Sequence, residues 1–306
     1  MKEIIYFDRM SKTLEKELVY GERFLHFLYA EEGFLNGLAK FLLLLIARLP
    51  FFSRVYGNLQ KKGSSQKKIV PFIQKFQIDE KEFLAPVSSF GSFNDFFIRK
   101  LKGSCRPMVL EEDVCVLPAD ARYLVFPRID QMEGFFVKGQ SLSLEELLQD
   151  DLLSAKYRTG SLVMARLCPV DYHRFHFPCD GTPTAARLIE GPLFSVNPIA
   201  LSRNLGILSE NKRMITEVKT SHFGTLLYIE VGATFVGTIH QTYQPNHQYK
   251  KGDEKGFFSF GGSCLLLLFE ENRVLFDLDL ITYSQQGIEV RALLGQSLGR
   301  SLQQKQ

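Results

Sequence analysis

The spacing of hydrophobic and polar positions changes about one third of the way along the chain. From Leu14 to Leu28, apolar residues recur at helical spacing with charged residues between them, which predicts an amphipathic helix. After about Arg106, short apolar runs alternate with turn residues, a pattern typical of strands. We therefore expect an α+β fold, with a helical, membrane-associating N-terminal region over residues 1–105 and a β-rich barrel or sandwich over residues 106–306.

The strand-like runs after Arg106 are separated by turn residues. They are VCVLPADARYLVF, GSLVMARL, TAARLIEG, TLLYIEVGATFVGTIH, GFFSF, CLLLLFE and RVLFDLDLI. One helix is expected to interrupt them, from Leu144 to about Lys156, because a capping box begins at Ser143. A second capping box, in the N-terminal region, begins at Ser92 and predicts a helix through Leu101.

A further N-terminal helix is expected from Phe34 to Ala47, where FLNGLAKFLLLLIA is apolar nearly all round. Spanning a bilayer takes about 20 apolar residues, so this segment is too short for a transmembrane helix. Two interpretations stay open: a buried core helix, or a segment from Phe34 to Phe52 that docks in the membrane interface. The docking interpretation uses the basic residues that follow to meet anionic headgroups. These residues are Arg48, Arg54, Lys61, Lys62, Lys67 and Lys68.

Composition narrows the class of protein. The 306 residues are 45% hydrophobic, which is enough for a substantial core and too much for a disordered chain. A formal charge of +3 is too small to favour a nucleic-acid partner. The five cysteines form no CxxC pair, which indicates reduced thiols in a cytosolic compartment. The N-terminus MKEIIYFDRMSK lacks the apolar segment of a secretory signal, so we expect no cleaved signal peptide.

The stretch Gly256–Glu270, GFFSFGGSCLLLLFE, carries the first candidate for catalysis. Apolar runs flank Gly261, Gly262 and Ser263, so two buried strands are expected to meet where the backbone needs the freedom of glycine. A serine hydroxyl beside an open peptide bond can attack the preceding carbonyl if a base takes its proton and donors hold the oxyanion. A β-bulge is the alternative explanation for two glycines in a strand pattern.

A second candidate lies in LCPVDYHRFHFPCDG, where His173 and His176 are three residues apart. Imidazole titrates near neutral pH, so the pair suits proton transfer. Two alternatives stay open: packed structural histidines, and a zinc site formed by these histidines with Cys179 and Cys168. The spacing matches none of the common zinc signatures.

Asp120 lies in LPAD between two strand-like runs, where an aspartate after proline is also typical of a turn. An aspartate, a histidine and a serine far apart in sequence are what a charge-relay set requires. Whether they meet depends on the fold.

Taken together, these motifs resemble the phosphatidylserine decarboxylase proenzymes, in the longer form typical of bacteria, over nearly the whole chain. The segments that carry the resemblance are FNDFFIRKLKGSCRP, LPADA, DYHRFHFPCDG, LFSVNP, NKR, VGATFVGTI and FGGSC. The resemblance implies a self-cleaving precursor whose serine becomes a pyruvoyl group. That group is the cofactor that removes carbon dioxide from phosphatidylserine and leaves phosphatidylethanolamine. No metal is implied.

Carried over to this sequence, the resemblance implies a self-cleavage triad of Asp120, His176 and Ser263, with scission between Gly262 and Ser263. His173 is implied to assist decarboxylation. Ser263, once converted to the pyruvoyl group, is implied to hold the substrate amine as a Schiff base. The expected products are chains 1–262 and 263–306, which stay together because the apolar runs beside the cut belong to one core.

The sequence departs from the family pattern at two positions. Cys264 follows the serine where the family usually has threonine, and Ala121 follows the aspartate where it usually has glycine. Neither change removes the nucleophile, the base or the carboxylate, so we expect an effect on rate and not a loss of activity.

The resemblance also implies a location and partners. We expect a peripheral protein on the cytoplasmic face of the cell membrane, with phosphatidylserine as substrate and its own small chain as partner; a homodimer is left open. The segment Leu193–Leu208 is expected to line the path of the lipid. Three rival hypotheses are a zinc hydrolase, a non-catalytic membrane-binding module, and a pyruvoyl enzyme that acts on a soluble amino acid.

Overall fold

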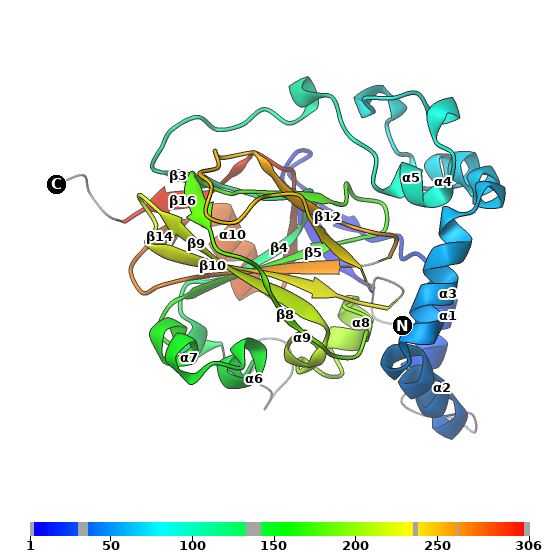
Figure 1. The fold of residues 1–306 in the computed structure, drawn as a ribbon, viewed down its shortest axis with the longest axis horizontal. Coiled ribbons are helices and arrows are strands. Elements are labelled where there is room, and N and C mark those ends of the chain that lie inside the picture. The colour runs from blue at the N-terminus through cyan, green and yellow to red at the C-terminus, as the bar shows by residue number, and fades with distance from the viewer. Residues whose placement is uncertain (1–2, 30–35, 133–141, 235–237, 262, 303–306) are drawn as a thin grey trace.

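The computed structural model describes residues 3–29, 36–132, 142–234, 238–261 and 263–302 (Figure 1). Its first part contains a strand pair followed by helices that lie along one side of the molecule in Figure 1. These elements are β1 (Ile5–Asp8), β2 (Thr13–Lys16), α1 (Glu22–Leu28), α2 (Asn36–Arg48), α3 (Pro50–Lys61), α4 (Ile69–Phe76) and α5 (Phe93–Phe97).

The remainder is mainly strands with five short helices between them. The strands are β3 (Val114–Val116), β4 (Ala121–Phe126), β5 (Ser161–Leu167), β6 (Arg174–His176), β7 (Gly181–Pro183), β8 (Arg187–Ile189), β9 (Arg213–Thr220), β10 (Thr225–Gly232), β11 (Ile239–Gln241), β12 (Glu254–Phe258), β13 (Ser263–Phe269), β14 (Val274–Phe276), β15 (Glu289–Ala292) and β16 (Ser297–Ser301). The helices are α6 (Leu144–Leu148), α7 (Asp151–Tyr157), α8 (Pro198–Leu201), α9 (Ile207–Glu210) and α10 (Leu278–Gln285).

One large sheet organises the fold. Its ten strands include an open path in the order β2-β1-β15-β4-β5-β13-β10-β9-β7, and β8 also pairs with β9. Strand β13 lies near the middle, hydrogen-bonded to β5 on one side and to β10 on the other, and all its residues are buried. Two three-stranded sheets, β11-β12-β6 and β14-β16-β3, complete the β structure.

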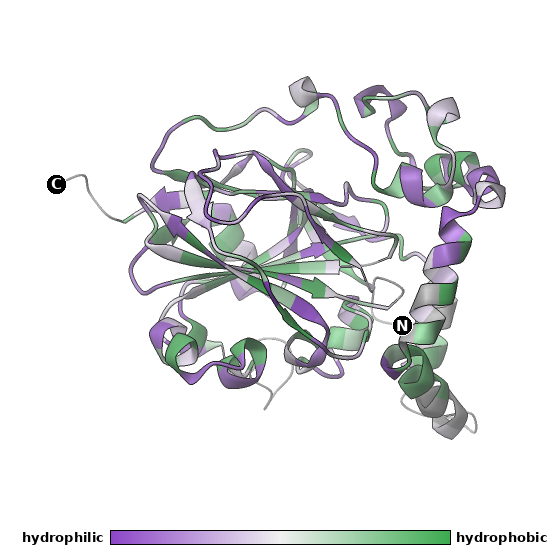
Figure 2. Cartoon of the chain, in the orientation of Figure 1, coloured by the Kyte–Doolittle hydropathy of each residue, from purple (hydrophilic) through white to green (hydrophobic). Residues whose placement is uncertain are grey.

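Each face of the large sheet has its own hydrophobic core. One face packs against α6, α7, α8 and α9, and the other packs against the two smaller sheets and α10. Along β13 the side chains alternate between these cores: Cys264 and Leu266 belong to the helix-covered face, and Leu265 and Leu267 to the other. Figure 2 shows the hydrophobic residues that run along these central strands. A third, phenylalanine-rich core joins α4 and α5 to Phe260.

The mixed α+β prediction is confirmed, but its details need correction. The predicted helix from Leu14 is wrong at its start, because residues 13–16 form β2 and the helix begins only at Glu22. Together β1 and β2 form a hairpin that joins the large sheet through β15, so the first part of the chain is not wholly helical. The strand order is open among the described strands, so the barrel alternative is also wrong.

Three predicted elements end differently from the expectation. The helix through Leu101 ends at Phe97, and the single helix over residues 144–156 is two helices separated at Gln149, which has a positive φ of 45°. The run RVLFDLDLI is a strand followed by α10, because Asp277 begins a helix. Both predicted N-caps are confirmed, since the hydroxyls of Ser92 and Ser143 accept hydrogen bonds from backbone N–H groups three residues later.

Candidate functional site

Ser263 begins the central strand β13 and is fully buried. It pairs with Leu167 of β5 and with Gly232 of β10, so its backbone is fixed from both sides. Its Oγ has no hydrogen-bond partner among the described residues. Gly261, two residues earlier, has a φ of 133°, a conformation that glycine adopts without strain. Gly262, the other half of the expected scission point, lies outside the described residues.

His173 lies in the loop before β6 and is also fully buried. Its ring stacks on Phe97 with centroids 3.8 Å apart, and its Nε2 donates a hydrogen bond to the carbonyl oxygen of Cys168 at 2.8 Å. A carbonyl can only accept, so Nε2 carries the hydrogen and Nδ1 has a free lone pair. Nδ1 has no partner. Burial, together with the positive charge of Arg99, lowers the pKa of His173 to about 3.

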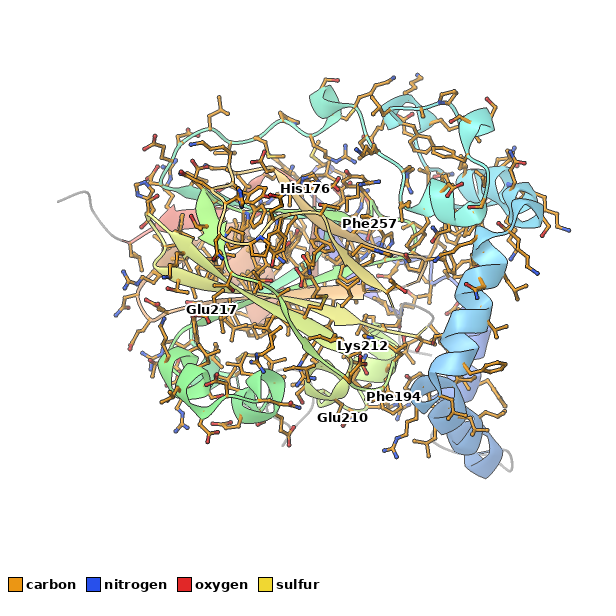
Figure 3. The ribbon with its side chains drawn as sticks, viewed as in Figure 1. His176, Phe194, Glu210, Lys212, Glu217 and Phe257 are labelled. Atoms are coloured by element: carbon orange, nitrogen blue, oxygen red, sulfur yellow. The ribbon has the colours of Figure 1, made fainter. Side chains whose placement is uncertain are left out.

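His176 ends strand β6 and has the same arrangement with its nitrogens exchanged. Its Nδ1 donates to the carbonyl oxygen of Gly252 at 2.9 Å, which leaves Nε2 with a free lone pair that no described residue contacts by a hydrogen bond. Burial lowers the pKa of His176, and the hydrogen bond to Gly252 and nearby carboxylates oppose that shift only in part. In Figure 3, His176 lies on the same side of the large sheet as Phe257 of β12.

Strand register explains how these side chains approach one another. Ser263 shares its face of β13 with Leu265 by alternation, and the small sheet that contains His176 covers that face. Ser263 also pairs with Leu167, the residue before the carbonyl that holds His173. The register therefore places Ser263 beside the segment that holds His173, under the small sheet that contains His176. The described contacts do not join Ser263 Oγ to either imidazole.

Unpaired buried polar atoms are concentrated in these residues. Six buried side-chain nitrogen or oxygen atoms lack a hydrogen-bond partner in the described part of the chain, and three of them are Ser263 Oγ, His173 Nδ1 and His176 Nε2. A fourth, Arg122 Nε, still lies 2.9 Å from the carboxylate of Glu17 in a poorly aligned ion pair. Since such atoms are rare in folded proteins and each costs about 1–3 kcal/mol, their concentration here indicates function.

Asp120 lies between β3 and β4 and is buried, but its carboxylate is occupied. Arg106 donates to it from Nε at 2.9 and 3.0 Å and from Nη2 at 2.7 Å, and the N–H of Leu294 donates at 2.9 Å. The described hydrogen bonds do not join Asp120 to His176. The two segments are linked through the backbone instead, because the N–H of His176 donates to the carbonyl of Pro118 at 2.9 Å. Asp120 therefore acts on His176 through its charge in this structure.

The geometry does not support the zinc interpretation of His173, His176, Cys179 and Cys168. In the described part of the chain, no three His, Cys, Asp or Glu side chains are grouped so that they could hold a metal ion. The Sγ of Cys168 instead accepts a hydrogen bond from Arg166 at 2.8 Å.

A cavity of about 550 Å³ opens beside the start of β13. Phe260 and Gly261 line it together with the loop Cys168–Val170, which precedes His173. The N-terminal helices also line it, through Leu25, Tyr56 and Lys75. Residues 195–197, within the predicted Leu193–Leu208 segment, also line it.

A cluster of paired charges borders the same cavity and was missed by the sequence analysis. Arg166, opposite Cys264 in the strand register, donates hydrogen bonds to the carboxylates of Glu17 and Glu289 at 2.5–3.2 Å. Arg122 extends the cluster with ion pairs to Glu17 and Asp171. Burial raises the pKa of Glu17, but the two arginines outweigh it and lower the pKa to about 2. The partners lie 49 residues apart for Arg122 and Asp171 and more than 100 apart for the other pairs, so no local pattern reveals them.

Comparisons with known proteins agree with these features. The family described as phosphatidylserine decarboxylase matches residues 93–300, a span that includes Asp120, both histidines and Ser263. Proteins named phosphatidylserine decarboxylase proenzyme are similar over nearly their whole length. The one from Chlamydia pneumoniae is 48% identical over 98% of both chains. The one from Chlamydia caviae is 48% identical over 99% of this chain and 100% of its own. The one from Chlamydia muridarum is 47% identical over 98% of both chains.

Proposed function

The chain belongs to the phosphatidylserine decarboxylase family, and we propose that it is a precursor that cuts itself before Ser263 and then converts phosphatidylserine into phosphatidylethanolamine and carbon dioxide. The observation that carries this proposal is the set of buried, unpaired polar atoms on Ser263, His173 and His176. One nucleophile and two uncharged bases in a site shielded from water suit acyl transfer followed by proton transfer.

Self-cleavage uses Ser263 as the nucleophile. His176 takes the hydroxyl proton at Nε2, Oγ attacks the carbonyl carbon of Gly262, and the amide becomes an ester. Elimination of this ester leaves dehydroalanine at position 263 and a free carboxylate on Gly262. Water then hydrolyses the dehydroalanine, and ammonia leaves. The products are a chain of 262 residues and a chain of 306 − 262 = 44 residues whose first residue carries a pyruvoyl group.

Asp120 assists this step through its negative charge. When His176 accepts the proton it becomes a cation, and a nearby carboxylate favours that charged form. Arg106 and the N–H of Leu294 hold the carboxylate in one orientation, so its field acts from a fixed position. In this proposal Asp120 acts on the imidazole of His176 through its charge, because the described hydrogen bonds do not join the two side chains.

The surroundings of position 263 fit a pyruvoyl group, because it is buried, held between two strands and next to the cavity. The group supplies an electron sink when carbon dioxide leaves. We assign proton movement to His173. Since its Nδ1 is free and unprotonated, it must first accept a proton, from the substrate amine, before it can return one to carbon. An imidazolium whose pKa is about 3 gives up that proton readily.

The cavity beside Gly261 is the proposed place of the lipid headgroup. Its wall includes Lys75, whose side chain makes no ion pair among the described residues. The headgroup carries a phosphate, and Lys75 lines the same cavity as residues 168–170. Lys75 is therefore the proposed phosphate partner, with residues 195–197 lining the path of the lipid.

Helix α3 presents an apolar stripe that suits a membrane surface. Phe51, Val55 and Leu59 follow one another every four residues, and all three are exposed, Phe51 by 65%. Basic residues Lys61 and Lys62 follow at the end of the helix. No helix in the described ranges has the length and apolar character needed to cross a membrane. We propose that this stripe docks the protein peripherally on the cytoplasmic face.

The test is an activity assay on vesicles that contain phosphatidylserine. Wild-type protein should form phosphatidylethanolamine and carbon dioxide in equal amounts, and Ser263→Ala should form neither. Equal behaviour of the two proteins would indicate a non-catalytic membrane-binding module. Decarboxylation of free serine with no response to the acyl chains would indicate a pyruvoyl enzyme for a soluble amino acid.

The same assay tests the role of Lys75. Lys75→Met should raise the KM for phosphatidylserine about tenfold, as expected for the loss of one charge-assisted contact. Lys67→Met is the matched control, because Lys67 lies in the same basic region and is absent from the cavity wall. An equal effect of both substitutions would assign Lys75 to general membrane attraction.

A further inference from the structure

Arg99 is a buried cation close to the candidate site, and the proposed mechanism gives it no role. It is only 5% exposed and lies over the rings of Phe83 and Phe96, 5.1 and 4.8 Å from their centroids. Its Nε has no hydrogen-bond partner in the described chain. Burial lowers its pKa to about 10, which still leaves it charged at neutral pH.

Two parallel links join the end of α5 to the loop before β6. In the first link, His173 stacks on Phe97 and donates to the carbonyl of Cys168. In the second, Arg99 donates from its two Nη atoms to the carbonyls of Phe96 and Val170, each at 3.4 Å. Phe96 precedes Phe97, and Val170 lies two residues after Cys168. The guanidinium therefore spans the same two segments that hold the imidazole.

Arg99 is also the charged group that acts on His173. The nearby carboxylates are engaged elsewhere: Asp120 and Glu82 with Arg106, and Asp171 with Arg122. Arg99 itself forms no ion pair in the described part of the chain. Since its charge is not neutralised by a direct partner, it opposes a second positive charge on the neighbouring imidazole.

We propose that Arg99 is a positioning residue for His173: by bridging Phe96 and Val170 it keeps the imidazole stacked on Phe97, dry and uncharged, with Nδ1 free. This inference rests on the proposed function only where it concerns catalysis. In the reaction, the arrangement holds His173 ready to accept a proton at Nδ1 and makes the resulting cation short-lived. Without the bridge, water reaches the ring, and the pKa of His173 rises toward that of a free histidine.

The experiment follows His173 by ¹⁵N NMR in the purified protein with labelled histidine, whether its chain is cut or intact, and His173→Gln assigns its signal. Wild type should show a single tautomer, protonated at Nε2, from pH 5 to pH 8. Arg99→Met should show His173 gaining a proton within this range. Arg174→Met is the matched control, because Arg174 also ties this segment to α5, through the carbonyl of Ile98, yet should leave the His173 titration unchanged.

Activity provides a second readout. One pH unit below its pKa, about a tenth of an imidazole is uncharged, so Arg99→Met should lose about tenfold in kcat between pH 7.5 and 5.5, relative to wild type, with KM unchanged. If Arg99→Met does not fold, Arg99→Gln replaces it with the same expectations. A His173 signal that keeps the wild-type tautomer and does not titrate in either variant overturns the inference. The NMR result does not depend on activity, so failure of the proposed decarboxylation would be recognised separately.

Discussion

At two neighbouring positions of the β5–β13 pair, the buried polar groups differ in whether they have hydrogen-bond partners. Where Ser263 pairs with Leu167, the hydroxyl of Ser263 has no hydrogen-bond partner in the described chain, and the same is true of one nitrogen each on His173 and His176. One residue further along, Arg166 opposite Cys264 is saturated by Glu17, Glu289 and the sulfur of Cys168. The comparison teaches that this fold can pair buried charges fully at one position and leave buried polar groups unpaired at the next, which is what the proposed chemistry at Ser263 requires.

The largest expected effects separate the two histidines of the reactive face. His176→Gln should slow self-cleavage by about 10²–10⁴-fold, because it removes the base for Ser263. His173→Gln should leave self-cleavage near the wild-type rate and lower decarboxylation by a similar factor. A time course of cleavage on denaturing gels after cell-free synthesis, with a lipid assay on the processed fraction, measures both. If His173→Gln instead slows self-cleavage and His176→Gln slows only decarboxylation, the roles assigned to the two histidines are reversed.

On the saturated face, substitution should cost stability and not chemistry. Arg166→Met leaves Glu17 and Glu289 buried without their main partner, so the free energy of unfolding should fall by about 3–5 kcal/mol. Urea unfolding in the uncut Ser263→Ala background measures this in a single chain. Arg128→Met, which breaks only exposed ion pairs with Asp130 and Glu271, should have a much smaller effect. Equal losses would mean that burial of the cluster is energetically unimportant.

The smallest expected effect concerns pH. The native pKa of His173 is about 3, below that of an unfolded histidine, so between about pH 6.5 and 3 the unfolded state binds a proton that the native state does not. The contribution of uncharged His173 to the free energy of unfolding is therefore fully present above pH 6.5. As the pH falls, that free energy decreases by about 1.4 kcal/mol per pH unit. His173→Gln in the Ser263→Ala background should reduce the slope of unfolding free energy against pH by that amount from pH 6 to pH 4.5. An unchanged slope would show that His173 is not held uncharged.

Local sequence patterns predicted the reactive face better than the rest of the molecule. Ser263, His173 and His176 could be named as candidates because each lies in a short motif whose residue types carry chemistry, and their catalytic roles stay predictions. The strands around them could be predicted because a strand that is buried on both faces is a run of consecutive apolar residues in the sequence. Arg99 and Arg106 also lie in a recognised segment, FNDFFIRKLKGSCRP, but nothing local says which carbonyl or carboxylate each one meets.

Long-range pairing could not be predicted in the same way. The β1–β2 hairpin pairs with β15, about 280 residues later, and the exposed edge strand β2 has no apolar alternation to mark it. The leucines from Leu14 to Leu28 therefore looked like one helix. The bond between Asp120 and Arg106 likewise depends on tertiary packing, so the expected contact of Asp120 with His176 could be tested only against coordinates.

The central claim is that Ser263 breaks the bond before it, and intact-mass measurement of freshly purified protein tests it most directly. Wild type should give two chains, of 262 and 44 residues, with the smaller one lighter than its sequence by one molecule of ammonia, because the hydroxyl oxygen of Ser263 leaves with Gly262 and water supplies the ketone oxygen. Ser263→Ala should give a single chain of 306 residues. A wild-type protein that stays a single unmodified chain while it decarboxylates phosphatidylserine would contradict the account.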